Sequence, residues 1–175
     1  MHGVNLWRSS LLKEYGVGSN ANYNKFNEDD YIQRLLFLNS TKVVFSGGDY
    51  IYRCNGQSIT KKFSLKQLGY LVTCKKLVDL VHKYDIGVHT YNIIMEYYFR
   101  TLIQLQIRLF NSKNNISKSD YKYAKQCLKN EYVNLMPYKK IYKFKDKSNS
   151  HIYRLASTSG YPIFLLTCKL FSYTK

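Results

Sequence analysis

The chain has 175 residues and is 45% hydrophobic, which is enough for one ordinary domain with a core and excludes wholesale disorder. Its formal net charge of +16, from 27 Lys and Arg against 11 Asp and Glu, far exceeds what solubility needs and calls for a polyanionic partner. RNA, DNA and an anionic membrane are the candidates, but no run of roughly 20 apolar residues is present, so we expect no membrane span.

Two short helices with a glycine turn between them are predicted in the first forty residues. Apolar spacing favours helices within residues 9–15 and 30–39. Gly16 and Gly18 allow unusual backbone angles, and backbone N–H groups near a helix suit a phosphate. A Gly-x-Gly pattern alone is also typical of an ordinary tight turn. The RNA-binding candidates in this turn are Tyr15, Gly16, Gly18 and Asn20.

Strand-like sequence follows between residues 42 and 63. It is divided by Gly-containing turns, and Asn55-Gly56 is among the strongest hairpin signals. This pattern predicts a β-hairpin or meander inserted between helices, with strands at residues 43–45, 50–54 and 58–63.

Two long helices are predicted after the insertion. Ser64 and Gln67 have the spacing of a capping box, and the helix that they open should end near residues 85–87. Thr90 is the expected cap of a second helix over residues 91–110. Cations near its C-terminal end also interact favourably with the helix dipole. Its candidate RNA-binding residues are Arg100, Arg108 and Lys113.

A third long helix should start at Ser117 or Ser119 and end near Val133. Its lysines are spaced by four, three and four residues, which places them on one face, expected opposite the apolar side. Like charges in this arrangement weaken a helix unless an anion lies against them, and a phosphate backbone supplies one. A solvated helix face is the alternative. The lysines are Lys118, Lys122, Lys125 and Lys129, and the expected inward residues are Ala124, Cys127, Leu128 and Tyr132.

The C-terminal part is predicted to be a basic β-meander. Alternating or apolar segments at residues 139–145, 152–156 and 163–173 are typical of strands and are separated by turn sequences. In a strand Lys143 points to one side and Tyr142 to the other, so a cationic face meets RNA while the aromatic side belongs to a core. The RNA-binding candidates here are Lys139, Lys140, Lys143, Lys145 and Lys147.

These elements together predict an α+β fold. It has an N-terminal helical region with an inserted β-hairpin or meander, three longer helices and a C-terminal β-meander. We expect residues 1–135 to form a mainly helical RNA-binding domain with the β insertion at 42–63, and residues 136–175 to form a basic β-meander extension.

Residues for catalysis or metal binding are sparse in this sequence. The four cysteines never form a C-x-x-C pair and are expected to be buried thiols, and no His has a Glu or Cys at ligand spacing. The single acidic run, at residues 28–30, precedes a helix, where acids favour the dipole. No P-loop or nucleophile elbow is present. We therefore expect no enzyme activity, cofactor, metal or small-molecule substrate, and we disfavour a nuclease, which would need clustered carboxylates.

Composition also bears on where the gene resides. Lys, Asn, Tyr, Ile and Phe are abundant and have A/T-rich codons, whereas Pro is rare. Residues 1–13 lack both the Arg- and Ser-rich run of a transit peptide and the apolar core of a secretory signal. These observations favour a mitochondrial matrix protein, possibly encoded in the organelle.

The order of several motifs resembles the family of small-subunit ribosomal protein S thirteen. The matching segments are GVNL at residues 3–6, YGVG at 15–18, FSL at 63–65, KY at 83–84 before Gly87, and RTLIQL at 100–105. The family's Gly- and Arg-rich tail is absent after Leu109. The resemblance implies a protein of the small-subunit head that binds ribosomal RNA and contacts small-subunit protein nineteen and large-subunit protein five.

The expected function is therefore that of a structural constituent of a small ribosomal subunit, in a mitochondrion, with ribosomal RNA and neighbouring ribosomal proteins as partners. Distributed Lys and Arg would contact phosphates, and Tyr would stack on bases. The alternative is an accessory subunit of an organellar respiratory complex that docks through Tyr-rich surfaces and contacts no nucleic acid.

Overall fold

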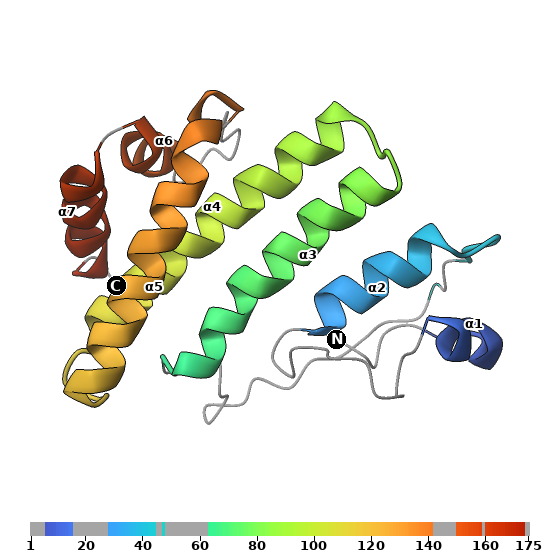
Figure 1. Ribbon diagram of the computed structural model, residues 1–175, viewed down its shortest axis with the longest axis horizontal. Coiled ribbons are helices and arrows are strands. Elements are labelled where there is room, and N and C mark those ends of the chain that lie inside the picture. Colours follow the sequence, from blue (N-terminus) through green and yellow to red (C-terminus); the bar gives the residue numbers. More distant parts are fainter. Residues whose placement is uncertain are drawn as a thin grey trace.

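Helices form all the regular secondary structure in the part of the chain that the computed structural model describes, namely residues 6–15, 28–44, 47, 63–141, 150–158 and 160–173 (Figure 1). In chain order they are α1 (Ser9–Glu14), α2 (Glu28–Leu38), the 3-10 helix η1 (Leu65–Leu68), α3 (Gly69–Lys83), α4 (Val88–Asn111), α5 (Lys118–Leu135), the 3-10 helix η2 (Met136–Ile141), α6 (Ser150–Thr158) and α7 (Tyr161–Ser172). The predicted α+β class is therefore wrong for these residues.

The C-terminal β-meander is replaced by helices. The segments predicted as strands at residues 152–156 and 163–173 lie in α6 and α7, and residues 139–141 belong to η2. A short apolar run fits both the two-residue period of a strand and the 3.6-residue period of a helix, so its spacing alone does not distinguish the two. Packing separates them here, because Phe164, Thr167 and Cys168 of α7 are buried at helical spacing and Pro162 lies in the first turn.

The predicted β insertion at residues 42–63 falls mostly outside the described residues. Lys42, Val43, Val44, Gly47 and Phe63 are described, and none of these five lies in a strand. Residues 45–46 and 48–62, which carry most of the predicted hairpins, are outside the described part.

The five helices predicted before residue 136 are confirmed, although three of their starts differ, since α2 begins two residues before the predicted position. Ser64 makes no side-chain cap, and the Gln67 side chain is buried instead of reaching back, so the chain enters α3 through the 3-10 turn η1. Gly87, with a φ of 84°, precedes α4, so Thr90 lies within the first turn of that helix. Of the two serines predicted to start α5, Ser117 is the cap, since its hydroxyl accepts from the Asp120 backbone N–H at 3.1 Å.

Helix α4 is the centre of the packing. It contacts α3, α5, α6 and α7, while α2 packs on the far side of α3 (Figure 1). Phe99 of α4 is fully buried, with its ring centroid 6.3 Å from that of Phe164 and 6.5 Å from that of Tyr132. Residues from α6 and α7 therefore belong to the same core as α3, α4 and α5.

A buried carboxylate links three of these helices. Glu131 of α5 accepts a hydrogen bond from the Tyr98 hydroxyl of α4 at 2.6 Å, and its other oxygen lies 2.7 Å from the Lys75 ammonium of α3. The Lys75 side chain is 52% exposed, so it brings a charge from the surface to an otherwise buried acid. Both carboxylate oxygens are satisfied, as a buried charge requires.

We expect Glu131→Ala to lower the free energy of unfolding by about 2 kcal/mol or more, because the buried Tyr98 hydroxyl loses its acceptor. Glu131→Gln keeps an acceptor and should cost clearly less. Lys75→Met removes a half-exposed side chain and keeps the hydrogen bond from Tyr98 to Glu131, so it should cost less than Glu131→Ala. Urea denaturation followed by circular dichroism measures all three, and an equal loss for Lys75→Met and Glu131→Ala would contradict this account.

The cysteines largely follow the prediction of buried thiols. Cys74 and Cys168 are buried, whereas Cys127, predicted to point inward, is only partly buried, and Cys54 lies outside the described residues. Burial raises the pKa of the Cys74 thiol and of the Cys168 thiol to about 12 in each case. Both stay protonated at neutral pH, and the protonated thiol is not the nucleophile.

Iodoacetamide at pH 8 should therefore modify Cys127 of the native protein before Cys74 and Cys168. In denaturant the three sites should react at similar rates, because the burial that suppresses the thiolate is lost. Peptide mass spectrometry over a time course gives the order. Rapid native labelling of Cys74 or Cys168 would show that these sites open readily.

Candidate nucleic-acid interface

The four lysines of α5 form the most concentrated basic feature among the described residues. Lys118, Lys122, Lys125 and Lys129, here called the lysine stripe, are all exposed. They span twelve residues, or about 17 Å along the helix axis at a rise of 1.5 Å per residue. The helix exposes these lysines because its apolar residues pack in the core. Ala124 and Leu128 are fully buried there.

The position of this stripe differs from the prediction. A helix turns about 100° per residue, so the centre of the stripe lies roughly 100° around the axis from the centre of the buried residues. The stripe therefore borders the buried face instead of lying opposite it. Tyr132, which was predicted to point inward, is buried beside the stripe. Its ring centroid is 5.2 Å from that of Tyr161, and the Lys129 ammonium lies 5.8 Å from the centroid of the Tyr161 ring.

The charges of the stripe are not neutralised within the described part of the protein. No ion pair involves Lys118, Lys122 or Lys125 there. Glu131, the acidic residue closest to Lys129 in sequence, is buried and already bound by Tyr98 and Lys75. The side chains are thus free to meet an external anion.

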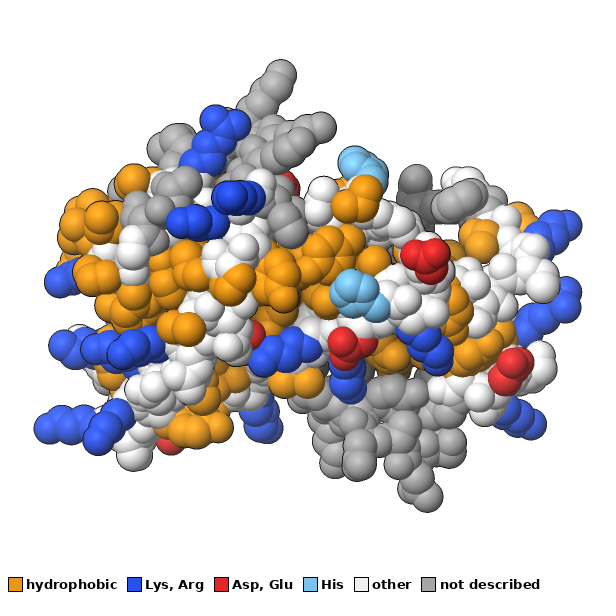
Figure 2. Space-filling view, turned by 45° about the horizontal axis from the view of Figure 1, so that its top comes forward, with side chains coloured by type: hydrophobic (Ala, Val, Ile, Leu, Met, Phe, Trp, Pro, Cys, Tyr) orange, Lys and Arg blue, Asp and Glu red, His pale blue; other side chains and the backbone are white. Residues whose placement is uncertain are grey.

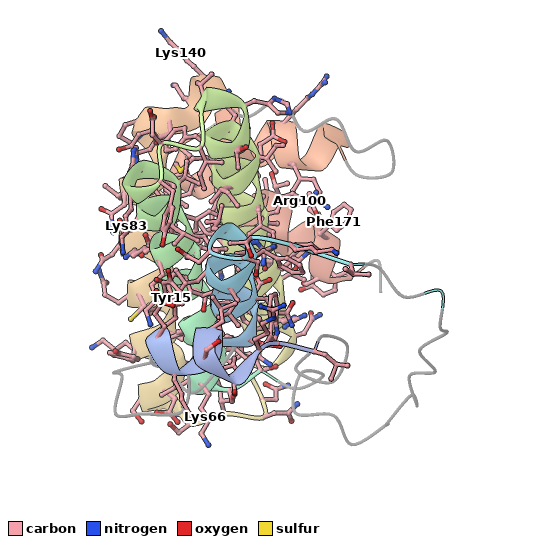
Figure 3. All side chains as sticks on the ribbon, turned by 90° about the vertical axis from the view of Figure 1, so that its right-hand side faces the viewer. Tyr15, Lys66, Lys83, Arg100, Lys140 and Phe171 are labelled. Atoms are coloured by element: carbon pink, nitrogen blue, oxygen red, sulfur yellow. The ribbon has the colours of Figure 1, made fainter. Side chains whose placement is uncertain are left out.

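Further exposed lysines lie near both ends of α5. Lys113 precedes the helix, and Lys139 and Lys140 follow it in η2, where Lys140 projects from one end of the molecule (Figure 3). The helix between them is about 27 Å long at 1.5 Å per residue. Lys143, Lys145 and Lys147 lie outside the described residues.

Arg100 and Arg108 are both half-buried on α4. The Arg100 guanidinium lies 5.3 Å from the Tyr153 ring of α6, a cation–π contact that joins these two helices. The sequence provides no signal for this pairing, because Tyr153 was expected in a strand. Arg100 therefore has a packing role that the sequence did not indicate, and its contact with RNA stays a prediction.

Of the candidate residues in the predicted glycine turn, the structure describes Tyr15. Tyr15 donates its hydroxyl hydrogen to Asn39 Oδ1 at 2.6 Å, and Asn39 Nδ2 donates to the Tyr84 hydroxyl at 2.8 Å. These bonds join the ends of α1, α2 and α3, so the Tyr15 hydroxyl already has a partner within the protein. Gly16, Gly18 and Asn20 lie outside the described residues.

Other basic residues are distributed around the molecule. Lys66 lies at the end opposite to Lys140, and Lys83 projects from another side (Figure 3). Lys83 is near the Tyr84 ring at 5.5 Å, and Lys76 is near the Tyr31 ring at 5.6 Å. The aligned charges of α5 are therefore a feature within a generally basic surface (Figure 2).

Other kinds of site are not evident among the described residues. No group of three or more His, Cys, Asp or Glu side chains in them could hold a metal ion, and no helix among them is long and apolar enough to cross a membrane. A shallow, open depression between η1 and the start of α5 is lined in part by Ser64, Lys66, Asn115, Ser117 and Asp120. Its lining mixes both charge signs and does not define a ligand.

No protein-family model, no curated protein and no solved structure matches this chain.

Proposed function

We propose that this protein binds RNA as a structural, non-catalytic component of a ribonucleoprotein. The observation that carries the proposal is the lysine stripe, four exposed cations aligned on about three turns of one helix. Like charges at these spacings destabilise a helix by a few tenths of a kcal/mol per pair. Phosphates along an RNA backbone would remove that repulsion and release their own counterions.

The arrangement suits contacts to the backbone more than contacts to bases. Lys is a flexible point charge, whereas planar, two-point recognition of base edges favours Arg, and the stripe contains no Arg. Phosphate contacts position a protein on nucleic acid without selecting its sequence. Selectivity would then come from the shape of a folded RNA.

The proposed particle is the small subunit of a mitochondrial ribosome, with ribosomal RNA and neighbouring ribosomal proteins as partners. This assignment rests on the sequence resemblance to ribosomal protein S thirteen and on the A/T-biased composition. The net charge of +16 supports any RNA-rich particle equally.

Charge reversal of the stripe tests RNA binding. The variant Lys122→Glu, Lys125→Glu, Lys129→Glu should weaken binding of the full chain to a labelled RNA hairpin by roughly tenfold or more. The slope of log K against log salt should fall by about 2 to 3, since each phosphate contact contributes about 0.7 to 0.9. Fluorescence anisotropy at several salt concentrations measures both quantities.

A matched control separates the stripe from net charge. Lys13→Glu, Lys42→Glu, Lys66→Glu changes the total charge equally at three exposed positions on other elements. It should leave most of the affinity and slope intact. Equal effects of the two triple variants, with both folded by circular dichroism, would reject the stripe as the RNA-binding surface.

Sedimentation of the native assembly tests the ribosomal assignment separately. The protein should sediment with small-subunit particles, and the RNA recovered with it should be small-subunit ribosomal RNA. A particle that contains a different RNA would overturn the assignment and leave RNA binding standing. A particle without any nucleic acid would overturn both.

A further inference from the structure

Helix α7 carries an apolar surface that the core does not use. Ile163, Leu166, Leu170 and Tyr173, here called the α7 stripe, are 47%, 56%, 61% and 75% exposed. Their spacing of three, four and three residues is that of the a and d positions in a heptad pattern. Hydrophobic side chains gather at the left end of the face in Figure 2, where α7 lies in Figure 1.

The other side of α7 fixes the helix to the protein. Phe164, Thr167 and Cys168 are buried, and Phe164 packs on Phe99 of α4 and Tyr132 of α5. At about 100° per residue, the α7 stripe points roughly 140° away from these buried residues. Because the opposite side of α7 is packed in the core, the α7 stripe faces solvent. An exposed apolar surface on a helix that is already packed is typical of an interaction site.

Charge around this stripe indicates what would cover it. Exposed Lys169 precedes Leu170 on the helix, and residues 147–175 contain no Asp or Glu. A second copy would bring another basic C-terminal region and a chain of net charge +16 against the first, so like charges would oppose self-association. A partner with acidic flanks would be complementary.

We propose that the α7 stripe docks an amphipathic helix of another protein, with apolar residues at heptad spacing and acidic residues beside them. The spacing of the α7 stripe fits the knobs-into-holes contact of two helices. A membrane-surface helix instead requires a strongly charged polar face with several cations, and the polar residues of α7 include a single Lys. This inference is independent of RNA binding, which uses α5.

The probe is a labelled, helix-stapled peptide of about three heptads with Leu at a and d and Glu at e and g. The full chain should bind it more tightly than a scrambled peptide of the same composition, which carries the charge without the apolar seam. A peptide with Lys in place of every Glu should bind more weakly still. Fluorescence anisotropy below the concentration at which the peptides self-associate gives the affinities.

Two pairs of variants place the peptide on the protein. Leu166→Gln, Leu170→Gln should weaken binding about tenfold or more, whereas Val88→Gln, Ile93→Gln, at exposed positions of α4, should not. Lys169→Glu should weaken binding of the acidic peptide more than Lys42→Glu does. The second variant makes the same charge change at an exposed position outside α7. The exposed Leu variants should fold normally and keep their RNA affinity.

Three outcomes would overturn the proposal. Equal affinities for the heptad peptide and the scrambled peptide would show that the binding is only non-specific charge attraction. A concentration-dependent dimer in sedimentation equilibrium that Leu166→Gln, Leu170→Gln abolishes would assign the surface to a second copy. Binding to phosphatidylserine-containing vesicles that the same variant abolishes would assign it to a membrane.

Discussion

The packing of α4 against its neighbours is the constraint on which the rest of the structure depends. Phe99, Leu102 and Leu109 are fully buried on this helix, and the core continues from them into α3, α5 and α7. Each neighbouring helix must turn its apolar side toward α4, because burial of apolar surface is the main favourable term in folding. The orientation of every external face follows from that requirement.

On α5 this requirement separates charges of opposite sign. Glu131 is drawn inward, where Tyr98 and Lys75 satisfy it, while the lysine stripe stays in solvent next to the tyrosines of the core. The same packing that stabilises the domain thus leaves a concentrated positive potential on its outside.

The two proposed surfaces lie on neighbouring helices, since Lys129 of the lysine stripe contacts Tyr161, the first residue of α7. A basic face and an apolar face on neighbouring helices would allow one small protein to contact an RNA and a protein helix together. Such a role needs rigid placement of surface side chains and no enclosed site.

The sequence by itself determined the net charge, the helices from α1 to α5 and the alignment of the lysines, because caps and 3.6-residue periodicity extend over long segments there. It did not determine the C-terminal elements. The apolar run containing Phe164 and Cys168 is short enough to fit a strand, and only its contacts with α4 and α5 select the helix. Tertiary packing also decided that Tyr132 lies against Tyr161 of α7, which brings α7 beside the lysine stripe, because the aromatic side chains of both helices pack in one core.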